Sequence, residues 1–241
     1  MWNDFIKANQ NPEFILKNKQ FSRAIGIVGG AGPMASAFLY KTIIEKCQKE
    51  YGANDYNEFP EIILESYPFT RGDSEKIKQD ISLCLTKLKN AGADLFSIAC
   101  NSFHGYLPDV SSIAFVNLVL ESLKEAAHLG VSKALILSAQ PTIDLKLYEQ
   151  TGLKCIYPED QKQIQKIIRE VAGGEVSQHQ AAKLGEIIQS SRLQIDGVVL
   201  ACTELPLIHQ KFPLSMQHNL PIIDTVGVLA KRLLILSQGK K

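Results

Sequence analysis

The sequence predicts an α/β protein made of two related lobes, each a mostly parallel β-sheet covered by helices. Short apolar runs alternate along the chain with stretches of helical periodicity, which is the pattern of parallel strands joined by helical crossovers. Two of the apolar runs end in a cysteine, Cys100 and Cys202. Each cysteine lies six residues after an aspartate, Asp94 in one half of the chain and Asp196 in the other. This repeated pattern indicates that the two halves share one architecture.

The first half of the chain opens with residues 1–22, a polar stretch that we interpret as an N-terminal extension. Its first strand leads into a tight loop, Gly29-Gly30-Ala31-Gly32-Pro33, and its last strand ends at Cys100. Apolar positions at helical spacing mark the two helices between these strands. The expected elements are, in order, a strand over 24–28, a helix over 34–51, a strand over 61–65, a helix over 74–90 and a strand over 94–99.

The second half follows a similar plan, because an early strand runs to Pro141 just as the first strand of the chain runs to Pro33. We expect Thr142 to be the N-cap of a helix that ends at Gly152. The other expected elements are strands over 133–137, 154–157, 196–201 and 220–224, helices over 160–172 and 178–191, and a C-terminal helix from about Val226.

Composition and charge argue against several classes of function. Lys and Arg total 26 against 25 Asp and Glu, so the formal net charge of +1 offers no basic field for nucleic acid. No apolar run approaches the roughly 18 residues of a membrane span, and the N-terminus does not resemble a signal peptide. Five cysteines, an odd number without close pairing, argue against a disulfide framework and for a reducing cytoplasm.

Cys100 and Cys202 are candidates for an acid/base pair. Each follows a predicted strand and precedes a predicted helix start, the place where open α/β sheets bind ligands. We expect the N–H groups of the helix starts to lower the pKa of both thiols towards neutrality. Two facing lobes would place one thiol on each side of a ligand, which is what inversion of a stereocentre by proton removal and return requires. Asn101, Ser102 and Thr203 are short donors suited to a carboxylate.

A structural alternative applies to every cysteine, because a free cysteine often behaves as a small buried hydrophobe. We adopt it for Cys47, Cys84 and Cys155, which lie within helix or strand patterns. For Cys100 and Cys202 the spacing alone leaves both interpretations open. The glycine loop fits neither G-x-G-x-x-G nor G-x-x-x-x-G-K-[ST], so we reject nucleotide binding.

Three segments taken together resemble the signature blocks of the aspartate/glutamate racemase family: residues 25–33, 100–104 and 201–205. The resemblance extends from about Ser22 to the C-terminus. It implies two pseudo-symmetric, three-layer α/β lobes with mostly parallel sheets and the active site between them. It also implies an enzyme that uses no cofactor, neither pyridoxal phosphate nor a metal.

The resemblance implies roles for individual residues. Cys100 and Cys202 correspond to the acid/base pair, and Arg71 is the nearest match to the arginine that pairs with the side-chain carboxylate in aspartate-specific members. His104 and Glu204 belong to the same blocks and are candidates for a supporting role. The implied substrate-binding residues are Gly30, Ala31, Arg71, Asn101, Ser102, Phe103 and Thr203.

We therefore expect a cytoplasmic racemase that interconverts the L and D forms of aspartate or, second, of glutamate, and that forms a homodimer as the resemblance implies. One alternative is another two-cysteine enzyme of the superfamily, of the maleate isomerase or hydantoin racemase type. Another is a non-catalytic amino-acid-binding paralogue. The first lobe is expected at residues 1–118 and the second at 119–221, with the C-terminal helix (224–241) packed back on the first lobe.

Overall fold

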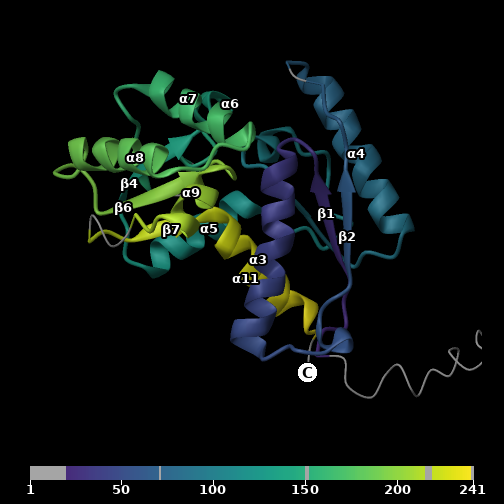
Figure 1. Cartoon of the computed structure of the whole chain (residues 1–241). Coiled ribbons are helices and arrows are strands. Elements are labelled where there is room, and N and C mark those ends of the chain that lie inside the picture. The colour runs from purple at the N-terminus through teal and green to yellow at the C-terminus, as the bar shows by residue number, and fades with distance from the viewer. Residues whose placement is uncertain (1–19, 71, 150–151, 215–218, 240–241) are drawn as a thin grey trace, which may run out of the picture.

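A computed structural model of the chain describes residues 20–70, 72–149, 152–214 and 219–239. Most of the predicted N-terminal extension lies outside these residues, and so does Arg71. The described residues form two parallel β-sheets covered by helices, which confirms the predicted α/β class (Figure 1).

The first sheet holds three parallel strands in the order β2-β1-β3, with β1 at its centre. Successive side chains of β1 point to opposite faces, so Ile27 packs in the hydrophobic cluster of α3 while Val28 packs in that of α4. Both helices fall within a few residues of their predicted bounds. The elements are β1 Ile25–Gly29, α3 Pro33–Tyr51, the 3₁₀ turn η1 Tyr56–Glu58, β2 Ile62–Ser66, α4 Ser74–Asn90, β3 Leu95–Ile98 and the 3₁₀ turn η2 Ser102–Tyr106.

The second sheet has four parallel strands in the order β5-β4-β6-β7, with β4 and β6 inside. Its first three strands repeat the connectivity of the first sheet, because β4, β5 and β6 correspond to β1, β2 and β3. The parallel bridge of Phe96 to Phe115 sits on the first sheet where β7 sits on the second. The elements are β4 Lys133–Ser138, α6 Gln140–Asp144, β5 Lys154–Ile156, α7 Gln161–Ala172, α8 Gln178–Ser190, β6 Gly197–Ala201, α9 Leu205–Lys211 and β7 Ile222–Asp224.

The two aspartates that precede the cysteines make equivalent hydrogen bonds in the two sheets. Asp94 Oδ2 accepts the backbone N–H of Ala24 at 2.8 Å, just before β1. Asp196 Oδ1 accepts the N–H groups of Ser132 and Lys133 at 3.0 and 2.8 Å, where β4 begins. Each carboxylate thus ties the start of the cysteine-bearing strand to the start of its central neighbour. This shared task accounts for the equal spacing from aspartate to cysteine in the two halves.

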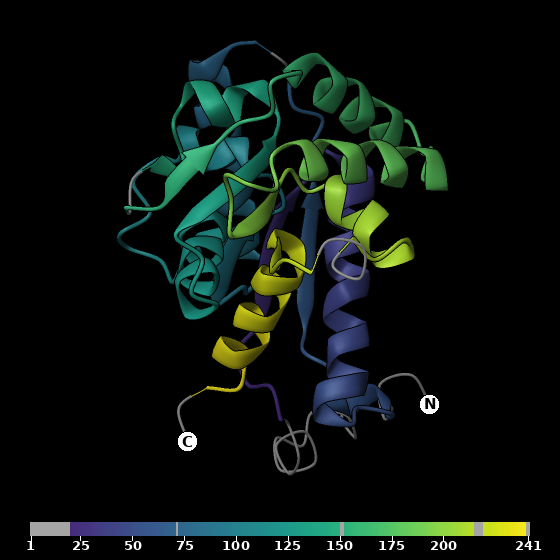
Figure 2. The same cartoon turned by 90° about the vertical axis from the view of Figure 1, so that its left-hand side faces the viewer.

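Two helices join the sheets into one core. The helix α5 (Leu118–His128) and the C-terminal helix α11 (Thr225–Ser237) pack against each other, and α11 also packs against α3 (Figure 2). The same hydrophobic cluster contains Ile25 and Ile27 of β1 and Val199 of β6, so the core runs from one sheet to the other. The backbone N–H of Ser22 donates to the Ser237 carbonyl at 2.8 Å, which ties the end of α11 to the segment before β1.

The predicted helix from Thr142 to Gly152 is wrong. The helix found there, α6, is five residues long, and Thr142 lies inside it instead of capping it. The Thr142 hydroxyl is buried and has no hydrogen-bond partner among the described residues. Lys146 has a left-handed backbone with φ of 51°, which stops the helical turn two residues after α6 ends. A lysine does not usually mark the end of a helix, so the sequence did not predict this one. The helix α5 was also not expected from the sequence.

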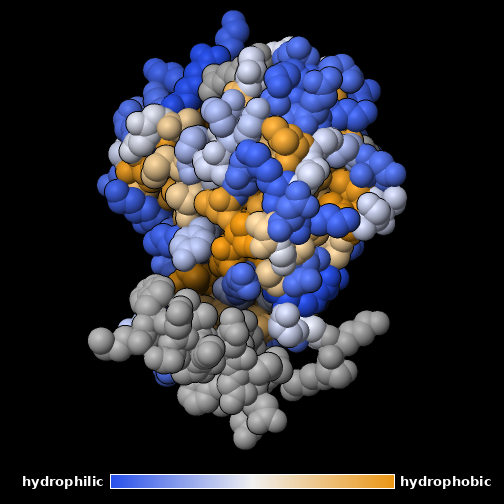
Figure 3. Space-filling view, turned by 90° about the vertical axis from the view of Figure 1, so that its right-hand side faces the viewer, coloured by the Kyte–Doolittle hydropathy of each residue, from blue (hydrophilic) through white to orange (hydrophobic). Residues whose placement is uncertain are grey.

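Seen from the side that carries α4 and the edge strand β2, hydrophilic residues cover the top of the molecule and hydrophobic residues gather across its middle (Figure 3). Leu64 on β2 is 38% exposed, and Met34 and Tyr40 on α3 are 49% and 46% exposed. In the part of the chain that the structure describes, no helix is both long and apolar enough to cross a membrane.

Candidate active site

The carboxyl ends of β3 and β6 bring the two cysteine blocks together. Cys100 lies two residues beyond β3, and Cys202 directly follows β6. The hydroxyl of Thr203 lies 3.5 Å from the carbonyl oxygen of Ala99, a contact between the residues next to the two cysteines. The strand ends of both sheets therefore meet at one place, which is the ligand position expected for this topology.

Cys202 is buried beside a carboxylate. Its side chain is 8% exposed, and Sγ donates to Glu204 Oε2 at 3.0 Å. The Thr203 hydroxyl lies 3.4 Å from the same carboxylate oxygen. Glu204 is itself 8% exposed and precedes α9 as its N-cap residue. The Cys202 thiol and this carboxylate thus form one buried hydrogen-bonded pair.

Cys100 has neutral partners instead. Its Sγ lies 3.4 Å from the Ser102 hydroxyl, and the backbone N–H groups of Ser102 and Phe103 at the start of η2 also point to it. The thiol is half-buried. The two cysteines are therefore placed alike by the fold, but a carboxylate supports Cys202 and a hydroxyl supports Cys100.

The expectation that the helix starts would lower both thiol pKa values is wrong. Burial raises the pKa of Cys100, and the N–H groups and hydroxyl around it offset this only in part. Burial and then the Glu204 charge raise the pKa of Cys202 well above its ordinary range. Loss of water around the thiols outweighs the dipole effect of the short turns that follow them. Both cysteines are thiols in this state, so a thiolate has to be generated within the site.

The remaining cysteines follow the structural interpretation. Cys47 and Cys84 are fully buried in hydrophobic clusters on α3 and α4, and burial raises the pKa of each to about 11. Cys155 is half-buried on β5, and its pKa is also raised to about 11 by burial. These three cysteines pack as small hydrophobes.

His104 connects the first cysteine block to α5. Its Nε2 accepts the backbone N–H of Leu118 at 3.1 Å, so Nδ1 carries the ring proton and donates to the Cys100 carbonyl at 2.9 Å. Burial lowers the pKa of His104 to about 4, which keeps the ring neutral. His104 therefore fixes the backbone of Cys100 and has no free ring nitrogen for proton transfer.

Asn101 is held by a buried network that spans both halves of the chain. Its Oδ1 accepts the Tyr148 hydroxyl at 2.5 Å, and its Nδ2 donates to Thr225 Oγ1 at 3.4 Å. The Thr225 hydroxyl in turn donates to the Leu200 carbonyl at 2.9 Å. Tyr148 and Thr225 were not singled out from the sequence, because neither lies near a cysteine block in the chain. Only the fold brings them to Asn101.

The glycine loop after β1 packs against the second cysteine block. Gly30 has φ of 98°, and a Cβ atom there would overlap the backbone of Tyr67. A Cβ atom at Gly32 would overlap Glu204 Oε1. The glycine loop can therefore pack against Tyr67 only because Gly30 lacks a side chain, and can reach the Glu204 carboxylate only because Gly32 lacks one. Ala31, between the two glycines, is partly exposed.

An aromatic group lies beside the first cysteine block. The ring of Phe103 meets that of Phe69 edge-on with a centroid distance of 4.8 Å, and Phe69 meets Tyr67 in the same way at 5.0 Å. These rings pack in the same hydrophobic cluster as Cys100. Arg71, predicted to bind a side-chain carboxylate, follows in the same loop but lies outside the described residues.

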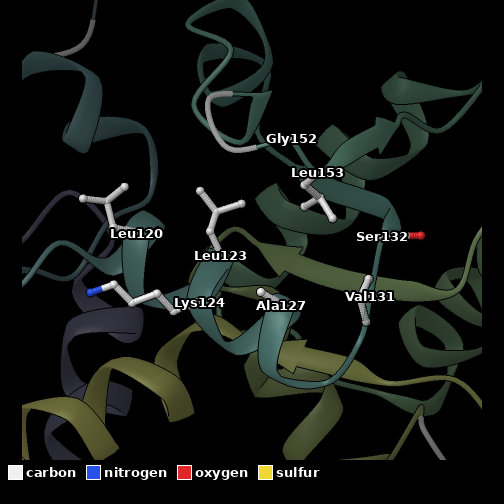
Figure 4. Close-up of a pocket in the computed structure, with 8 residues that line it drawn as sticks. All are labelled: Leu120, Leu123, Lys124, Ala127, Val131, Ser132, Gly152 and Leu153. Carbon is white, nitrogen blue, oxygen red and sulfur yellow. The ribbon is translucent and has the colours of Figure 1, made fainter.

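A separate cavity of about 420 Å³ lies away from the cysteines (Figure 4). It opens near the amino ends of β4 and β5, whereas the cysteines follow the carboxyl ends of their strands. Its walls are mostly apolar, so it offers no acid/base group apart from one lysine. The lining residues are Leu120, Leu123, Lys124, Ala127, Val131, Ser132, Gly152 and Leu153.

Comparisons with known proteins agree with this arrangement. Over 220 residues the chain is 28% identical to the broad specificity amino-acid racemase RacX of Bacillus subtilis (strain 168), a match that covers 86% of this chain and 95% of that protein. The aspartate racemase of Picrophilus torridus superposes with a TM-score of 0.74 at 25% identity, covering 91% of this chain and 96% of the other. A glutamate racemase of Francisella tularensis subsp. tularensis SCHU S4, solved with D-glutamate, shares the fold with a TM-score of 0.62 at 16% identity, covering 90% and 81%.

The sequence itself matches a family profile along most of its length. Residues 28–233 match the profile described as Asp/Glu/hydantoin racemase, and this range includes both cysteine blocks and the whole glycine loop. The family resemblance drawn from the three sequence blocks is thereby confirmed. The chain belongs to the Asp/Glu/hydantoin racemase family.

Proposed function

We propose that this protein is an amino-acid racemase that interconverts L- and D-aspartate, or the glutamate enantiomers, by proton transfer between Cys100 and Cys202. One observation supports the proposal: the cysteine-bearing strand ends of two related sheets lie together, with the Thr203 hydroxyl 3.5 Å from the Ala99 carbonyl oxygen. A thiol on each side of Cα is the arrangement that inversion needs, and the chemistry requires no cofactor.

In the proposed reaction, one cysteine as a thiolate removes the Cα proton while the opposite thiol delivers its own proton to the other face. The first cysteine ends as a thiol and the second as a thiolate, so atoms and charge balance. The reverse direction exchanges the roles. The substrate α-carboxylate gains negative charge as the Cα–H bond breaks, and donors already in place stabilise this charge.

The carboxylate donors in this proposal are Asn101, Ser102 and Thr203, together with the backbone of the glycine loop at Gly30 and Ala31. The bond from Asn101 to Thr225 uses one of the two Nδ2 hydrogens, which leaves the other for the substrate. The Tyr148 hydroxyl fixes which way this amide faces, because it occupies Oδ1.

Arg71 is proposed to pair with the side-chain carboxylate and so to favour aspartate, then glutamate. A second candidate function, broad amino-acid racemisation, is supported by the aromatic group beside Cys100. The rings of Tyr67, Phe69 and Phe103 offer an apolar wall that suits uncharged side chains. The similarity to a broad specificity racemase points the same way. Maleate isomerase or hydantoin racemase activity and non-catalytic binding remain the outcomes to be tested against these two.

We also propose that the protein is cytoplasmic and forms a homodimer. All five cysteines are free, which suits a reducing compartment. The exposed hydrophobic side chains of Leu64, Met34 and Tyr40 provide surface that a second subunit could cover. Light scattering of the purified protein measures the subunit number directly.

The function is tested by incubating the purified protein without added cofactor with each enantiomer of aspartate, glutamate and a set of uncharged amino acids. Chiral chromatography should show both enantiomers approaching a 1:1 mixture. Cys100→Ser and Cys202→Ser should lose this activity, and the control Cys155→Ser should keep it. Preference for aspartate supports the first candidate, and similar rates on uncharged amino acids support the second. Conversion of maleate or a hydantoin alone, or no turnover at all, would contradict both.

A further inference from the structure

We propose that Glu204 holds the proton that Cys202 releases, so that Cys100, Cys202 and Glu204 share two protons and one negative charge throughout the reaction. This inference rests on the proposed racemase function and deepens it, because it names how a thiolate arises in a buried site. It adds Glu204 as a supporting residue that acts through the Cys202 thiol.

The geometry places the carboxylate where it can accept that proton. Glu204 Oε2 lies 3.0 Å from Cys202 Sγ, and the thiol is the donor in this bond. The other oxygen, Oε1, packs against the backbone of Gly32, where no side chain intervenes. The carboxylate is thus fixed between the glycine loop of the first sheet and the thiol of the second. Glu204 is also the N-cap residue of α9, yet its side chain does not cap that helix.

The alternative of ionising Cys202 beside an ionised Glu204 is unfavourable. It would place two negative charges about 3 Å apart in a buried site. When the proton instead moves from Sγ to Oε2, one negative charge is present before and after. The resulting Glu204 acid can donate a hydrogen bond to the thiolate it has created. Among the described residues, no carboxylate forms a hydrogen bond with Cys100, whose Sγ faces the neutral Ser102 hydroxyl.

The proton count closes over a full turnover. In the proposed resting state both cysteines are thiols, and the Glu204 carboxylate accepts the hydrogen bond from Cys202. Transfer from Cys202 to Glu204 gives a thiolate, which takes the Cα proton while Cys100 donates to the opposite face. The site then holds the Cys202 thiol, the Cys100 thiolate and the Glu204 acid, which is the state that starts the reverse reaction. Loss of the Glu204 proton to solvent and uptake of a solvent proton by the Cys100 thiolate restore the resting state, so the number of protons in the site is unchanged.

The proposal predicts an unusual dependence on pH. Two other titratable groups act on Cys202: Cys100, and Tyr148, which follows α6. On α9 itself, His209 accepts the backbone N–H of Leu214 and interacts with Asp224. Because the reactive thiolate forms by a transfer inside the site, kcat/KM should be nearly constant around neutral pH. Without the carboxylate, Cys202 must lose its proton to solvent, and the rate should then rise with pH.

The test compares Glu204→Gln with the wild type and with the control Glu75→Gln, an exposed glutamate on α4. For Glu204→Gln we expect kcat/KM at pH 7 to fall by about 10²- to 10⁴-fold and to rise about tenfold per pH unit. Glu75→Gln should match the wild type. Glu204→Asp keeps a proton acceptor, so its profile should stay flat even if its rate is lower. A Glu204→Gln profile parallel to that of the wild type would overturn the proposal.

A second readout does not depend on turnover. The rate at which iodoacetamide alkylates Cys202, located by mass spectrometry, reports the thiolate population. It should be nearly independent of pH around neutrality in the wild type and should rise about tenfold per pH unit in Glu204→Gln, because solvent then has to remove the proton. If the wild type racemises no amino acid, the proposed function fails, while the alkylation rates still decide the role of Glu204. Equal pH dependence in both proteins would refute that role.

Discussion

Removing one hydroxyl at Tyr148 should weaken both the fold and substrate binding. The Tyr148 ring is fully buried, and its hydroxyl donates to Asn101 Oδ1 at 2.5 Å. Asn101 is 2% exposed, so in Tyr148→Phe its carbonyl oxygen would lose this partner without gaining water. Leaving a buried acceptor unpaired costs about 1–3 kcal/mol of unfolding free energy. For a chain of this size, each kcal/mol corresponds to a fall in Tm of about 2–4 °C.

The same substitution should affect the substrate site, because Tyr148 fixes the orientation of the Asn101 amide. Without the Tyr148 hydroxyl, the Asn101 amide can rotate so that its oxygen faces the substrate carboxylate. The amide oxygen and the carboxylate would then repel each other. We expect KM for the amino acid to rise by about tenfold, equivalent to about 1.4 kcal/mol. The measurements are urea unfolding and steady-state kinetics on the same preparation.

Tyr157→Phe is the matched control for this prediction. Its hydroxyl donates to Glu149 at 2.8 Å in an exposed position, where water can replace it. This variant should lie within about 0.5 kcal/mol of the wild type, as is usual for surface positions. If Tyr148→Phe is as stable as Tyr157→Phe and has an unchanged KM, the network does not position Asn101 and this reasoning fails.

Two further predictions concern Arg71 and His104. Arg71→Lys or Arg71→Ala should lower kcat/KM for aspartate by roughly 10- to 140-fold, equivalent to about 1.5–3 kcal/mol, and should affect an uncharged amino acid less. Equal losses on both substrates would show that Arg71 does not contact the side chain. The folded-state pKa of His104 is lowered from 6.5 to about 4, so its contribution to stability is full above pH 6.5 and is lost as the pH falls towards 4. Urea unfolding across this range should show a shallower pH dependence in His104→Gln than in the wild type, and identical slopes would count against a buried neutral imidazole.

The sequence predicts the strand ends of this fold well because buried parallel strands consist of short apolar runs. The equal spacing of the two aspartates from the cysteines corresponds to a structural repeat, since Asp94 and Asp196 each accept hydrogen bonds at the start of a central strand. The sequence pattern did not predict the end of a helix where no glycine or proline marks it. The short helix α6 ends before the left-handed Lys146, and nothing near Lys146 in the sequence marks that conformation.

The electrostatics of the site could not be predicted from local pattern either. The position of a thiol at a helix start can be inferred from the sequence, but its desolvation depends on what the folded chain packs around it. Burial reverses the expected direction of the pKa shift at both Cys100 and Cys202. Tyr148 and Thr225 reach Asn101 from distant parts of the chain, so only the assembled fold shows that they belong to the site.

The central claim, two thiols acting on opposite faces of Cα, is tested most directly by single cysteine variants and a substrate that needs one thiol only. Elimination from β-chloroalanine, followed by chloride release, requires Cα deprotonation but no proton return to the other face. Cys100→Ser and Cys202→Ser should each lose racemisation by at least about 10²-fold, and each should eliminate from one enantiomer, with opposite preferences. The same preference in both variants, or racemisation near the wild-type rate in either, would contradict the two-thiol mechanism.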